Sequence, residues 1–487
     1  MITNIISSPV MGILAVVYFI TIVFLCLMII LENRAPVQTL SWVVVILLVP
    51  FIGIIIYFIL GQNFRKKKIY SRKAVIDSEY LFAAAGEQRE TLKEKLRNKT
   101  AAVREKSHLM TLMLNNEKAM LSEHNSLDLL LNASETFPAM LAAIEGATKY
   151  IHLEFFRFDV DPTGNVFRHS LMKKAREGVE VRVIIDDVGS WSFKAKYINE
   201  MRAAGVEIFP FHPVRFPFLA NKINYRNHRK ILVVDGKKGY IGGLNIAEKY
   251  LRGLKDLGPW RDTHMEIRGE AVASMNMVFL IDWYFVSKIV LTREKKYFDV
   301  ESVDGNKLVQ LATSGPDSDY ANIMQVYFSA MSTARECIYL CTPYFSPNES
   351  ILTALKTAAL GGVDVRILLP GKSDSPIGNW NSRSYISELL EAGVRVYLYS
   401  QGFNHSKFMI VDRVFSSVGS PNVDMRSFLL NFEVTALVYD EEFSEKLEKV
   451  FMNDLQSSNE VLSELWSGRK KSEKYKESLS RILGPLY

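Results

Sequence analysis

One pattern of chemically active residues occurs twice in this chain, roughly 180 residues apart. Each copy has a histidine, a lysine two positions later, an aspartate five positions after the lysine, and a small-residue turn that ends in asparagine. The first copy consists of His228, Lys230, Asp235, Gly242, Gly243 and Asn245. The second copy consists of His405, Lys407, Asp412, Gly419, Ser420 and Asn422. Because residue type and spacing agree between the copies, we interpret them as the halves of one duplicated active site.

The apolar run after each histidine predicts a β-strand. Residues 230–234 and 407–411 are short runs rich in β-branched and other apolar side chains, and an Asp-Gly turn follows the first run. Since residues two apart in a strand project from the same face, each histidine is expected beside its lysine. Two such pairs brought together form a pocket with two cations and two titratable imidazoles, which suits phosphate.

This residue set predicts phosphoryl transfer through a covalent intermediate. One histidine can attack phosphorus and form a phosphohistidine, which divides one difficult displacement into two easier ones. The other histidine then donates a proton to the leaving alcohol and accepts one from the incoming alcohol. Such opposite roles require surroundings that separate the pKa values of the two histidines. The side chains expected to bind the non-bridging phosphate oxygens are Lys230, Lys407, Asn245 and Asn422.

The aspartates of the pattern, Asp235 and Asp412, allow two interpretations. Each lies where its strand turns, and aspartate is favoured in turns because its side chain accepts local hydrogen bonds. A positioning role is at least as consistent with the sequence as direct participation. Both aspartates are therefore kept as candidate catalytic residues with either role open.

The pattern H-x-K-x4-D-x6-G-[GS]-x-N, present twice, resembles the phospholipase D superfamily. Segments outside the pattern are similar to bacterial cardiolipin synthases, and the similarity extends over nearly the whole chain. The resemblance implies a reaction that joins two phosphatidylglycerol molecules into cardiolipin and releases glycerol, without a metal or an organic cofactor. The similar segments are 33–42 (NRAPVQTLSW), 260–264 (WRDTH), 342–345 (TPYF) and the ending near 483–486.

The resemblance also implies roles for individual residues. By this resemblance, His228 of the first copy is expected to be the nucleophile and His405 of the second copy the acid and base. Family members place a carboxylate after each motif to orient the histidine, and Asp262 and Glu433 occupy those places as candidate substrate-site residues. The intervals after the two motifs are unequal, and an ordinary salt bridge or turn is the alternative for both acids.

Two apolar runs near the N-terminus predict a membrane anchor. Residues 10–31 and 40–60 contain no charged side chain, and each run is long enough to cross a hydrocarbon core of about 30 Å as a helix. Their short link predicts an antiparallel hairpin within residues 1–65. A cleaved signal peptide is disfavoured, because no basic region precedes the first run and a second run follows it closely.

Basic residues predict the orientation of this anchor. The cluster of arginine and lysine at residues 65–68 follows the second run, whereas the link between the runs carries only Arg34. The positive-inside rule therefore predicts a multi-pass protein of the cell membrane, with its N-terminus and its catalytic domains in the cytoplasm. The net charge of +6 suits an anionic surface but does not separate membrane from nucleic acid.

The remainder of the chain predicts two similar α/β halves. Residues 140–186 and 328–370 share one order of helix, strand, helix, Gly-Val turn and strand, and each half then reaches its histidine. We expect a helical linker over 66–125, followed by two pseudo-symmetric phospholipase D-like α/β domains over 126–300 and 301–487. The second domain is expected to end in a basic helix.

The predicted function is that of a membrane-bound phosphatidyltransferase that makes cardiolipin from two phosphatidylglycerol molecules. A phospholipase D that transfers the phosphatidyl group to water, or another phosphatidyltransferase, would carry the same motifs. A phospholipase D-like nuclease is disfavoured by the apolar runs, so phospholipid and membrane are the expected partners and nucleic acid is not. An inactive scaffold is disfavoured because both motifs are complete, and three cysteines without a histidine cluster predict no zinc site. The sequence leaves the oligomeric state open.

Overall fold

The computed structural model describes four parts of the chain, residues 9–31, 36–57, 79–214 and 224–483. The chain divides into two compact units. We call them the N-terminal unit, which contains residues 1–69 and 214–224, and the large unit, which contains residues 70–213 and 225–487.

The described residues of the N-terminal unit form the helices α2 (Pro9–Leu31), α3 (Pro36–Leu48) and α4 (Pro50–Ile56). The apolar run 10–31 lies within one helix. The run 40–60, expected as one helix, is instead broken at Val49, because Pro50 lacks an N–H group and starts a new helix. Residues 58–60 of that run lie outside the described residues. Among the residues that the structure describes, no helix combines the length and the apolar character needed to cross a membrane, so the hairpin stays a prediction.

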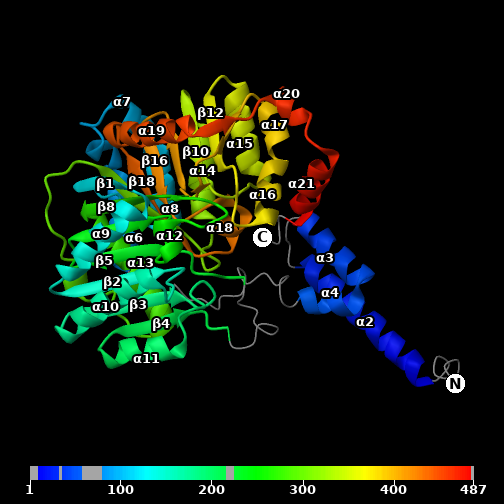
Figure 1. The fold of residues 1–487 in the computed structure, drawn as a ribbon, viewed down its shortest axis with the longest axis horizontal. Coiled ribbons are helices and arrows are strands. Elements are labelled where there is room, and N and C mark those ends of the chain that lie inside the picture. Colours follow the sequence, from blue (N-terminus) through cyan, green and yellow to red (C-terminus); the bar gives the residue numbers. More distant parts are fainter. Residues whose placement is uncertain (1–8, 32–35, 58–78, 215–223, 484–487) are drawn as a thin grey trace. The chain divides into compact units, whose positions relative to one another are not determined.

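The large unit is built on two mixed sheets that share one strand order. The first sheet runs β1-β8-β6-β5-β2-β3-β4, and the second runs β9-β18-β16-β15-β10-β12-β13 with β19 added at its edge. Figure 1 shows the first sheet in cyan and green and the second in yellow and orange. The prediction of two similar α/β halves is therefore confirmed.

The strands of both sheets have the following bounds. The first sheet contains β1 (Asn125–Leu131), β2 (Tyr150–Phe155), β3 (Glu180–Asp186), β4 (Glu207–Phe211), β5 (Lys230–Val234), β6 (Lys238–Gly242) and β8 (Thr263–Gly269). The second sheet contains β9 (Leu308–Ser314), β10 (Cys337–Cys341), β12 (Asp364–Pro370), β13 (Arg395–Tyr399), β15 (Phe408–Val411), β16 (Phe415–Gly419), β18 (Glu433–Tyr439) and β19 (Ser458–Glu460). In each half, the strand after the histidine pairs antiparallel with both of its neighbours, β5 with β2 and β6, and β15 with β10 and β16.

The helices of the two halves also follow one order. In the first half they are α9 (Asn132–Glu145), α10 (Pro162–Arg176), α11 (Ala195–Ala203), α12 (Glu248–Arg252) and α13 (Ala271–Ser287). In the second half they are α14 (Asn322–Ser332), α15 (Glu349–Leu360), α16 (Pro376–Ser384), α17 (Ile386–Glu391), α18 (Met425–Leu429) and α19 (Glu441–Gln456), with α16 and α17 together in the place of α11. The two Gly-Val turns predicted from the repeat have equivalent geometry, since Gly178 and Gly362 both have φ of 91°, a conformation that glycine adopts without strain.

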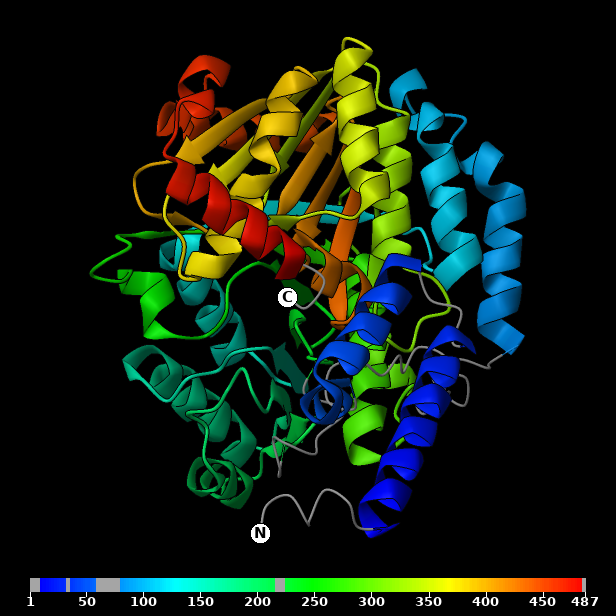
Figure 2. The same cartoon turned by 90° about the vertical axis from the view of Figure 1, so that its right-hand side faces the viewer.

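Helices also lie at both ends of the large unit. The linker forms α6 (Glu79–Lys95), α7 (Ala101–Glu105) and α8 (Ser107–Glu117), and its side chains Leu92, Leu96 and Val103 are buried in the core of the second half. Figure 2 shows these blue helices beside the yellow-green helices of that half, where α8 packs on α14. After α20 (Ser463–Ser467), the basic C-terminal helix α21 (Lys471–Leu483) packs on α16.

Candidate active site

The two halves are joined at the residues that surround the histidines. Strand β7 (Trp260–Arg261) of the first half pairs in parallel with β14 (Phe403–Asn404) of the second, and a bridge joins Asn227 to Phe432. The backbone N–H of His228 donates to the carbonyl of Phe432 at 2.9 Å, and that of His405 donates to the carbonyl of Arg261 at 2.7 Å. Each motif histidine is therefore held by backbone of the opposite half, in the same way on both sides.

The side chains of the histidines are paired across the halves as well. His228 Nδ1 lies 2.9 Å from both carboxylate oxygens of Glu433, and His405 Nδ1 lies 2.8 Å from Oδ2 of Asp262. Both carboxylates are fully buried. The acid that follows each motif thus orients the histidine of the other motif, and in both pairs Nε2 is the ring nitrogen left for substrate.

An asparagine that precedes each histidine shapes the turn into the strand. Asn227 Oδ1 accepts the backbone N–H of Arg229 at 3.1 Å, and Asn404 Oδ1 accepts that of Ser406 at 3.0 Å. These bonds fix the backbone on both sides of the histidine. Sequence reasoning missed the two asparagines, although both copies read Asn-His-x-Lys and the repeat was a usable signal.

The small residues of the motifs allow the carboxylates to approach. A Cβ atom at Gly243 would lie 2.1 Å from Oδ1 of Asp262, so this position accepts only glycine without a shift. At the equivalent position of the second half, the hydroxyl of Ser420 hydrogen-bonds the carboxylate of Glu433. Each small residue therefore borders the acid of its own half.

The two motif lysines are buried beside their histidines. Lys230 Nζ donates to the carbonyl of His228 at 2.5 Å, and Lys407 Nζ donates to the carbonyl of His405 at 2.7 Å. The ammonium of Lys407 also lies 3.0 Å from Nδ1 and 3.2 Å from Nε2 of His405. The ammonium of Lys407 therefore lies against the imidazole of its histidine, whereas that of Lys230 is bound to the backbone of its histidine.

The two motif asparagines have different surroundings. Asn245 is engaged within the protein, since its Oδ1 accepts the backbone N–H of Arg157 at 3.1 Å and its Nδ2 donates to the hydroxyl of Tyr250 at 2.7 Å. Asn422 lines a pocket beside His228, and its buried Oδ1 has no hydrogen-bond partner among the residues that the structure describes. The geometry therefore favours Asn422 over Asn245 for contact with a substrate.

The two motif aspartates lie away from the histidines. Asp235 follows β5, and its carboxylate accepts the backbone N–H groups of residues 148–150 at 2.8–2.9 Å. Asp412 follows β15, accepts the backbone N–H groups of residues 335–337 at 2.8–3.2 Å, and contacts Lys106 Nζ at 2.6 Å. Both aspartates tie the start of β2 or β10 to the neighbouring strand, which favours the positioning role over direct participation.

Burial and charge act differently on the two histidine–carboxylate pairs. Burial lowers the pKa of His228 to about 4, although the charge of Glu433 opposes this shift. Burial tends to raise the pKa of Glu433, but its contact with His228 and the charge of Lys230 hold it below the usual value. At neutral pH this pair therefore consists of an ionised carboxylate and a neutral imidazole, as a nucleophile requires.

The second pair has a different protonation. Burial raises the pKa of Asp262 to about 7, against the opposing charge of Lys407. Burial also lowers the pKa of His405 well below its usual value, and the charges of Lys407, Lys230 and Lys249 lower it further. A carboxyl and an imidazole that share a hydrogen bond titrate together. Below about pH 7 this pair therefore carries one titratable proton in addition to the N–H of the neutral imidazole.

The cationic groups of the site are crowded. Burial lowers the pKa of Lys407 to about 8 and that of Lys230 well below its usual range. Ammonium groups buried next to imidazoles are stabilised by an anion placed between them, which a phosphodiester provides. Within the described parts of the chain, no group of histidine, cysteine and acidic side chains is arranged to hold a metal ion.

A pocket of about 310 Å³ opens beside His228. Its lining comes from both halves and includes two short paired strands, β11 (Phe345–Ser346) and β17 (Val423–Asp424). The sequence offered no signal for most of this lining, because the residues come from loops, short strands and the helices α16 and α18, which no repeated motif marks. The lining residues are Phe156, Arg226, His228, Tyr344, Phe345, Ser346, Ser375, Gly378, Asn381, Ser382, Asn422, Asp424, Arg426 and Asn431.

Comparisons with known proteins agree with this architecture. The family described as "Cardiolipin synthase, PLD-like domain" matches residues 140–270 and 327–455, one match in each half. The family described as "Phospholipase_D-nuclease N-terminal" matches residues 13–62.

Individual relatives cover the chain almost completely. A cardiolipin synthase of Geobacillus sp. (strain WCH70) is 43% identical over 99% of this chain and 95% of its own length. Cardiolipin synthase 2 of Staphylococcus epidermidis is 37% identical over 99% of both chains. The crystal structure of phosphatidylserine synthase from Haemophilus influenzae shares the fold, with a TM-score of 0.58 and 16% identity over 77% of this chain and 96% of that chain. With one complete histidine motif in each matched half, this chain belongs to the phospholipase D-like cardiolipin synthase family.

Proposed function

We propose that this protein is a phosphatidyltransferase that joins two phosphatidylglycerol molecules into cardiolipin and releases glycerol. The single observation that carries this proposal is the crossed pairing of His228 with Glu433 and of His405 with Asp262. It brings two oriented imidazoles and two buried lysines to one place, as transfer through a phosphohistidine requires. The relatives named cardiolipin synthase point to the same reaction.

His228 is the proposed nucleophile. Its imidazole is neutral at pH 7, and the ionised carboxylate of Glu433 fixes the proton on Nδ1, which leaves the Nε2 lone pair for phosphorus. Attack forms the N–P bond, and the bond between phosphorus and the glycerol oxygen of the donor breaks. The surroundings thus support the order of roles that the family resemblance implies.

His405 is the proposed acid and base. The proton shared by His405 and Asp262 passes to the leaving glycerol oxygen, and the same pair later removes a proton from the acceptor hydroxyl. Lys230 and Lys407 bind the non-bridging oxygens as negative charge develops. Losing one preorganised donor of this kind typically costs about 10²- to 10³-fold in rate.

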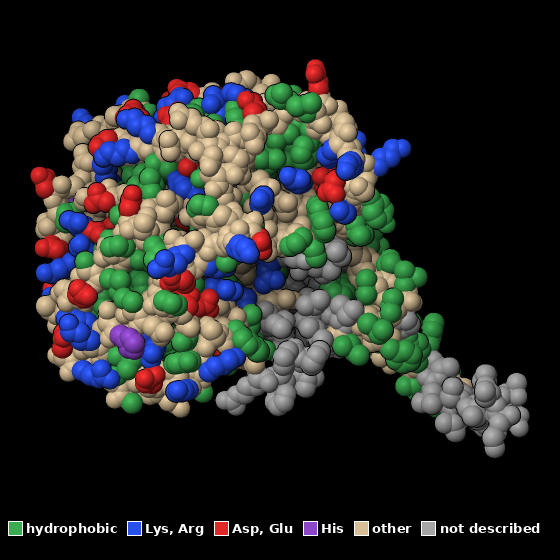
Figure 3. Space-filling model, viewed as in Figure 1, with side chains coloured by type: hydrophobic (Ala, Val, Ile, Leu, Met, Phe, Trp, Pro, Cys, Tyr) green, Lys and Arg blue, Asp and Glu red, His purple; other side chains and the backbone are tan. Residues whose placement is uncertain are grey.

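We also propose that the N-terminal helices hold the enzyme in the membrane, with the catalytic halves on the cytoplasmic side. Helix α2 exposes large apolar side chains along its length, such as Val16, Phe19 and Phe24, which are 58–67% exposed. Figure 3 shows hydrophobic side chains covering these helices, whereas basic and acidic side chains are interspersed over the large unit. The basic cluster after the second apolar run supports this orientation.

The test is an assay of purified full-length protein in detergent micelles with phosphatidylglycerol as the sole lipid. Separation of the products by chromatography is expected to give cardiolipin and glycerol in equal amounts. Phosphatidic acid without cardiolipin would identify a hydrolase and contradict the proposal. The His228→Ala variant is the control for contaminating activity.

A further inference from the structure

The environments of the two motif histidines correspond residue by residue. The bridges Asn404–Arg261 and Asn227–Phe432 join the halves in the same way, so they align the two environments. The asparagines that end the motifs, Asn245 and Asn422, give a second pair of equivalent positions. The correspondence matches Trp260 with Asn431, Phe403 with Arg226, Ala247 with Asp424 and Lys249 with Arg426.

Aromatic side chains occupy the His405 side. The rings of Trp260, Phe403 and Tyr250 lie 5.4, 5.7 and 6.0 Å from the imidazole of His405. The ammonium of Lys249 lies 4.6 Å above the ring of Trp260, which is a cation–π contact. Three aromatic rings of the protein therefore lie around this imidazole.

The His228 side borders the 310 Å³ pocket, and the ring of Phe156, 5.0 Å away, is the only one against its imidazole among the described residues. At the matched positions it carries Asn431, Arg226, Asp424 and Arg426, and all four line the 310 Å³ pocket. Among these matched positions, the shorter Asn431 stands in place of Trp260, and the cationic Arg226 stands in place of Phe403. The two halves therefore differ in the residues around their histidines. Such a difference is needed in a reaction that binds one lipid as donor and another as acceptor.

Two guanidinium groups from opposite halves line this pocket. Arg226 is 4% exposed and lies 3.5 Å from the buried carboxylate of Asp186. Burial and the charge of Arg226 together lower the pKa of Arg426, although the charge of Asp424 opposes them. The carboxylate of Asp424 accepts the backbone N–H of Ser427 at 2.7 Å and so caps α18. An anion between the arginines relieves their repulsion, and arginine binds phosphate oxygens in pairs.

We propose that this pocket binds the glycerophosphate headgroup of the acceptor phospholipid, with Arg226 and Arg426 on its phosphodiester. This inference rests on the proposed function, in which a second phosphatidylglycerol accepts the phosphatidyl group. A volume of about 310 Å³ suits a headgroup and not a whole lipid. The serine and asparagine side chains of the lining supply donors and acceptors for glycerol hydroxyls.

The bound acceptor completes the second half of the reaction. Its terminal hydroxyl oxygen attacks the phosphohistidine, so a P–O bond forms while the bond between phosphorus and Nε2 of His228 breaks. The electron pair of that bond returns to the ring nitrogen, and the hydroxyl proton passes to the His405–Asp262 pair. Glycerol and water lack the phosphodiester that the arginines bind, so the pocket distinguishes a lipid acceptor from both.

Two reactions of the same full-length protein distinguish an effect on acceptor binding from an effect on donor binding. Exchange of radiolabelled glycerol into phosphatidylglycerol uses one phospholipid, whereas cardiolipin formation uses two. In phosphatidylglycerol vesicles, Arg426→Gln and Arg226→Gln are each expected to lower the ratio of cardiolipin formation to glycerol exchange by about 10- to 100-fold. Arg426→Lys keeps the charge but not the paired geometry, so a smaller fall in the ratio is expected.

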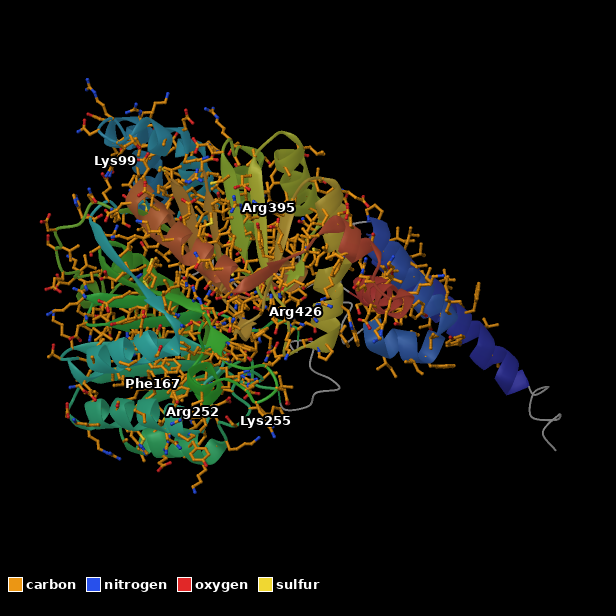
Figure 4. The ribbon with its side chains drawn as sticks, turned by 45° about the horizontal axis from the view of Figure 1, so that its top comes forward. Lys99, Phe167, Arg252, Lys255, Arg395 and Arg426 are labelled. Atoms are coloured by element: carbon orange, nitrogen blue, oxygen red, sulfur yellow. The ribbon has the colours of Figure 1, made fainter. Side chains whose placement is uncertain are left out.

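Arg252→Gln is the matched control, because this arginine of the first half has a 77% exposed side chain and lies outside the pocket lining. Figure 4 labels both Arg252 and Arg426, the latter where the two halves meet. A ratio that stays constant in the pocket variants, whether both rates fall or neither does, overturns the inference. Glycerol exchange without cardiolipin in the unmodified protein would instead overturn the proposed function, so the two failures are distinguishable.

Discussion

The imidazole of His405 in the second half lies 2.8 Å from the carboxylate of Asp262 in the first half. The equivalent contact joins His228 to Glu433 in the opposite direction. Each half therefore supplies the imidazole of one pair and the carboxylate of the other. A single half therefore contains a histidine without the carboxylate that contacts it.

The crossed pairs predict distinct effects for the two carboxylates. Glu433→Gln removes the charge that fixes the tautomer of His228, so formation of the phosphoenzyme is expected to slow by roughly 10²-fold or more. Asp262→Asn removes the proton shared with His405, so it is expected to slow by a similar factor both formation of the phosphoenzyme, which expels glycerol, and its transfer to the acceptor hydroxyl. Rapid quenching with labelled phosphatidylglycerol measures both steps. Unchanged quench kinetics in both variants would show that the carboxylates do not act through the opposite histidines.

Replacement of each histidine separates the nucleophile from the acid. His228→Ala is expected to abolish the acid-labile phosphoenzyme, because no nitrogen remains to attack phosphorus. His405→Ala is expected to slow formation of the phosphoenzyme or to trap it, because protonation of the leaving oxygen and deprotonation of the acceptor are lost. Phosphorus-31 NMR or radiolabel trapping reports the intermediate. Intact turnover in both variants would overturn the assignment.

The raised pKa of Asp262 predicts a pH dependence. A pKa of about 7 means that the His405–Asp262 pair is protonated below pH 7 and loses its proton above it. Because the proton is needed to expel glycerol, kcat/KM is expected to fall about tenfold per pH unit above pH 7. The Asp262→Asn variant is expected to lose this alkaline limb, since an amide does not titrate. An identical limb in that variant would assign the titration to another group.

The motif aspartates are expected to act on stability. Asp235→Asn and Asp412→Asn keep a residue that tolerates the positive φ of 56° and 54° at these positions but lose the charge that the backbone N–H groups bind. Each is expected to lower the free energy of unfolding by about 1–3 kcal/mol, with kcat at low temperature within about threefold of the unmodified protein. Thermal unfolding and activity at matched temperatures separate the two effects. A loss of activity as large as that of His228→Ala, without a loss of stability, would restore direct participation.

Asp412 also predicts how the stability of the protein depends on pH. Burial tends to raise the pKa of Asp412, but hydrogen bonds from Lys106 and the backbone hold it below the usual value. A lowered pKa contributes stability that is fully present above the ordinary value of about 4. This contribution is lost as the pH falls below that value towards the folded pKa. The stability difference between the protein and Asp412→Asn is therefore expected to shrink on acidification.

The close approach of Gly243 to Asp262 predicts intolerance of any side chain there. Gly243→Ala places a methyl group 2.1 Å from Oδ1 of Asp262 and is expected to displace the carboxylate from His405. We expect a destabilisation of about 1–3 kcal/mol and a loss of activity. Gly86→Ala is the control, because nothing lies within 4 Å of a Cβ atom at this helical position. That change is expected to stabilise the protein by roughly 0.5–1 kcal/mol.

The sequence by itself determined the chemistry and the repeat. Six positions in each copy of the motif identified the histidines and lysines, because strand periodicity places residues two apart on one face wherever the strand lies. The repeated order of helices and strands likewise predicted the two α/β halves, since local apolar patterns and Gly-Val turns set each element. Pro50 also carried a signal for the break in the second apolar run, which hydropathy alone concealed.

Tertiary structure alone decided how these elements cooperate. The crossing of His228 with Glu433 joins residues 205 positions apart, and no local pattern encodes which carboxylate reaches which ring. Burial, which sets the pKa of Asp262 and of the lysines, depends on the packing of both halves. Arg226 and Arg426 line the pocket beside His228, whereas the matched positions on the other side hold Phe403 and Lys249. These equivalent positions are distant in sequence, so their differences affect one site only after folding has brought both halves together.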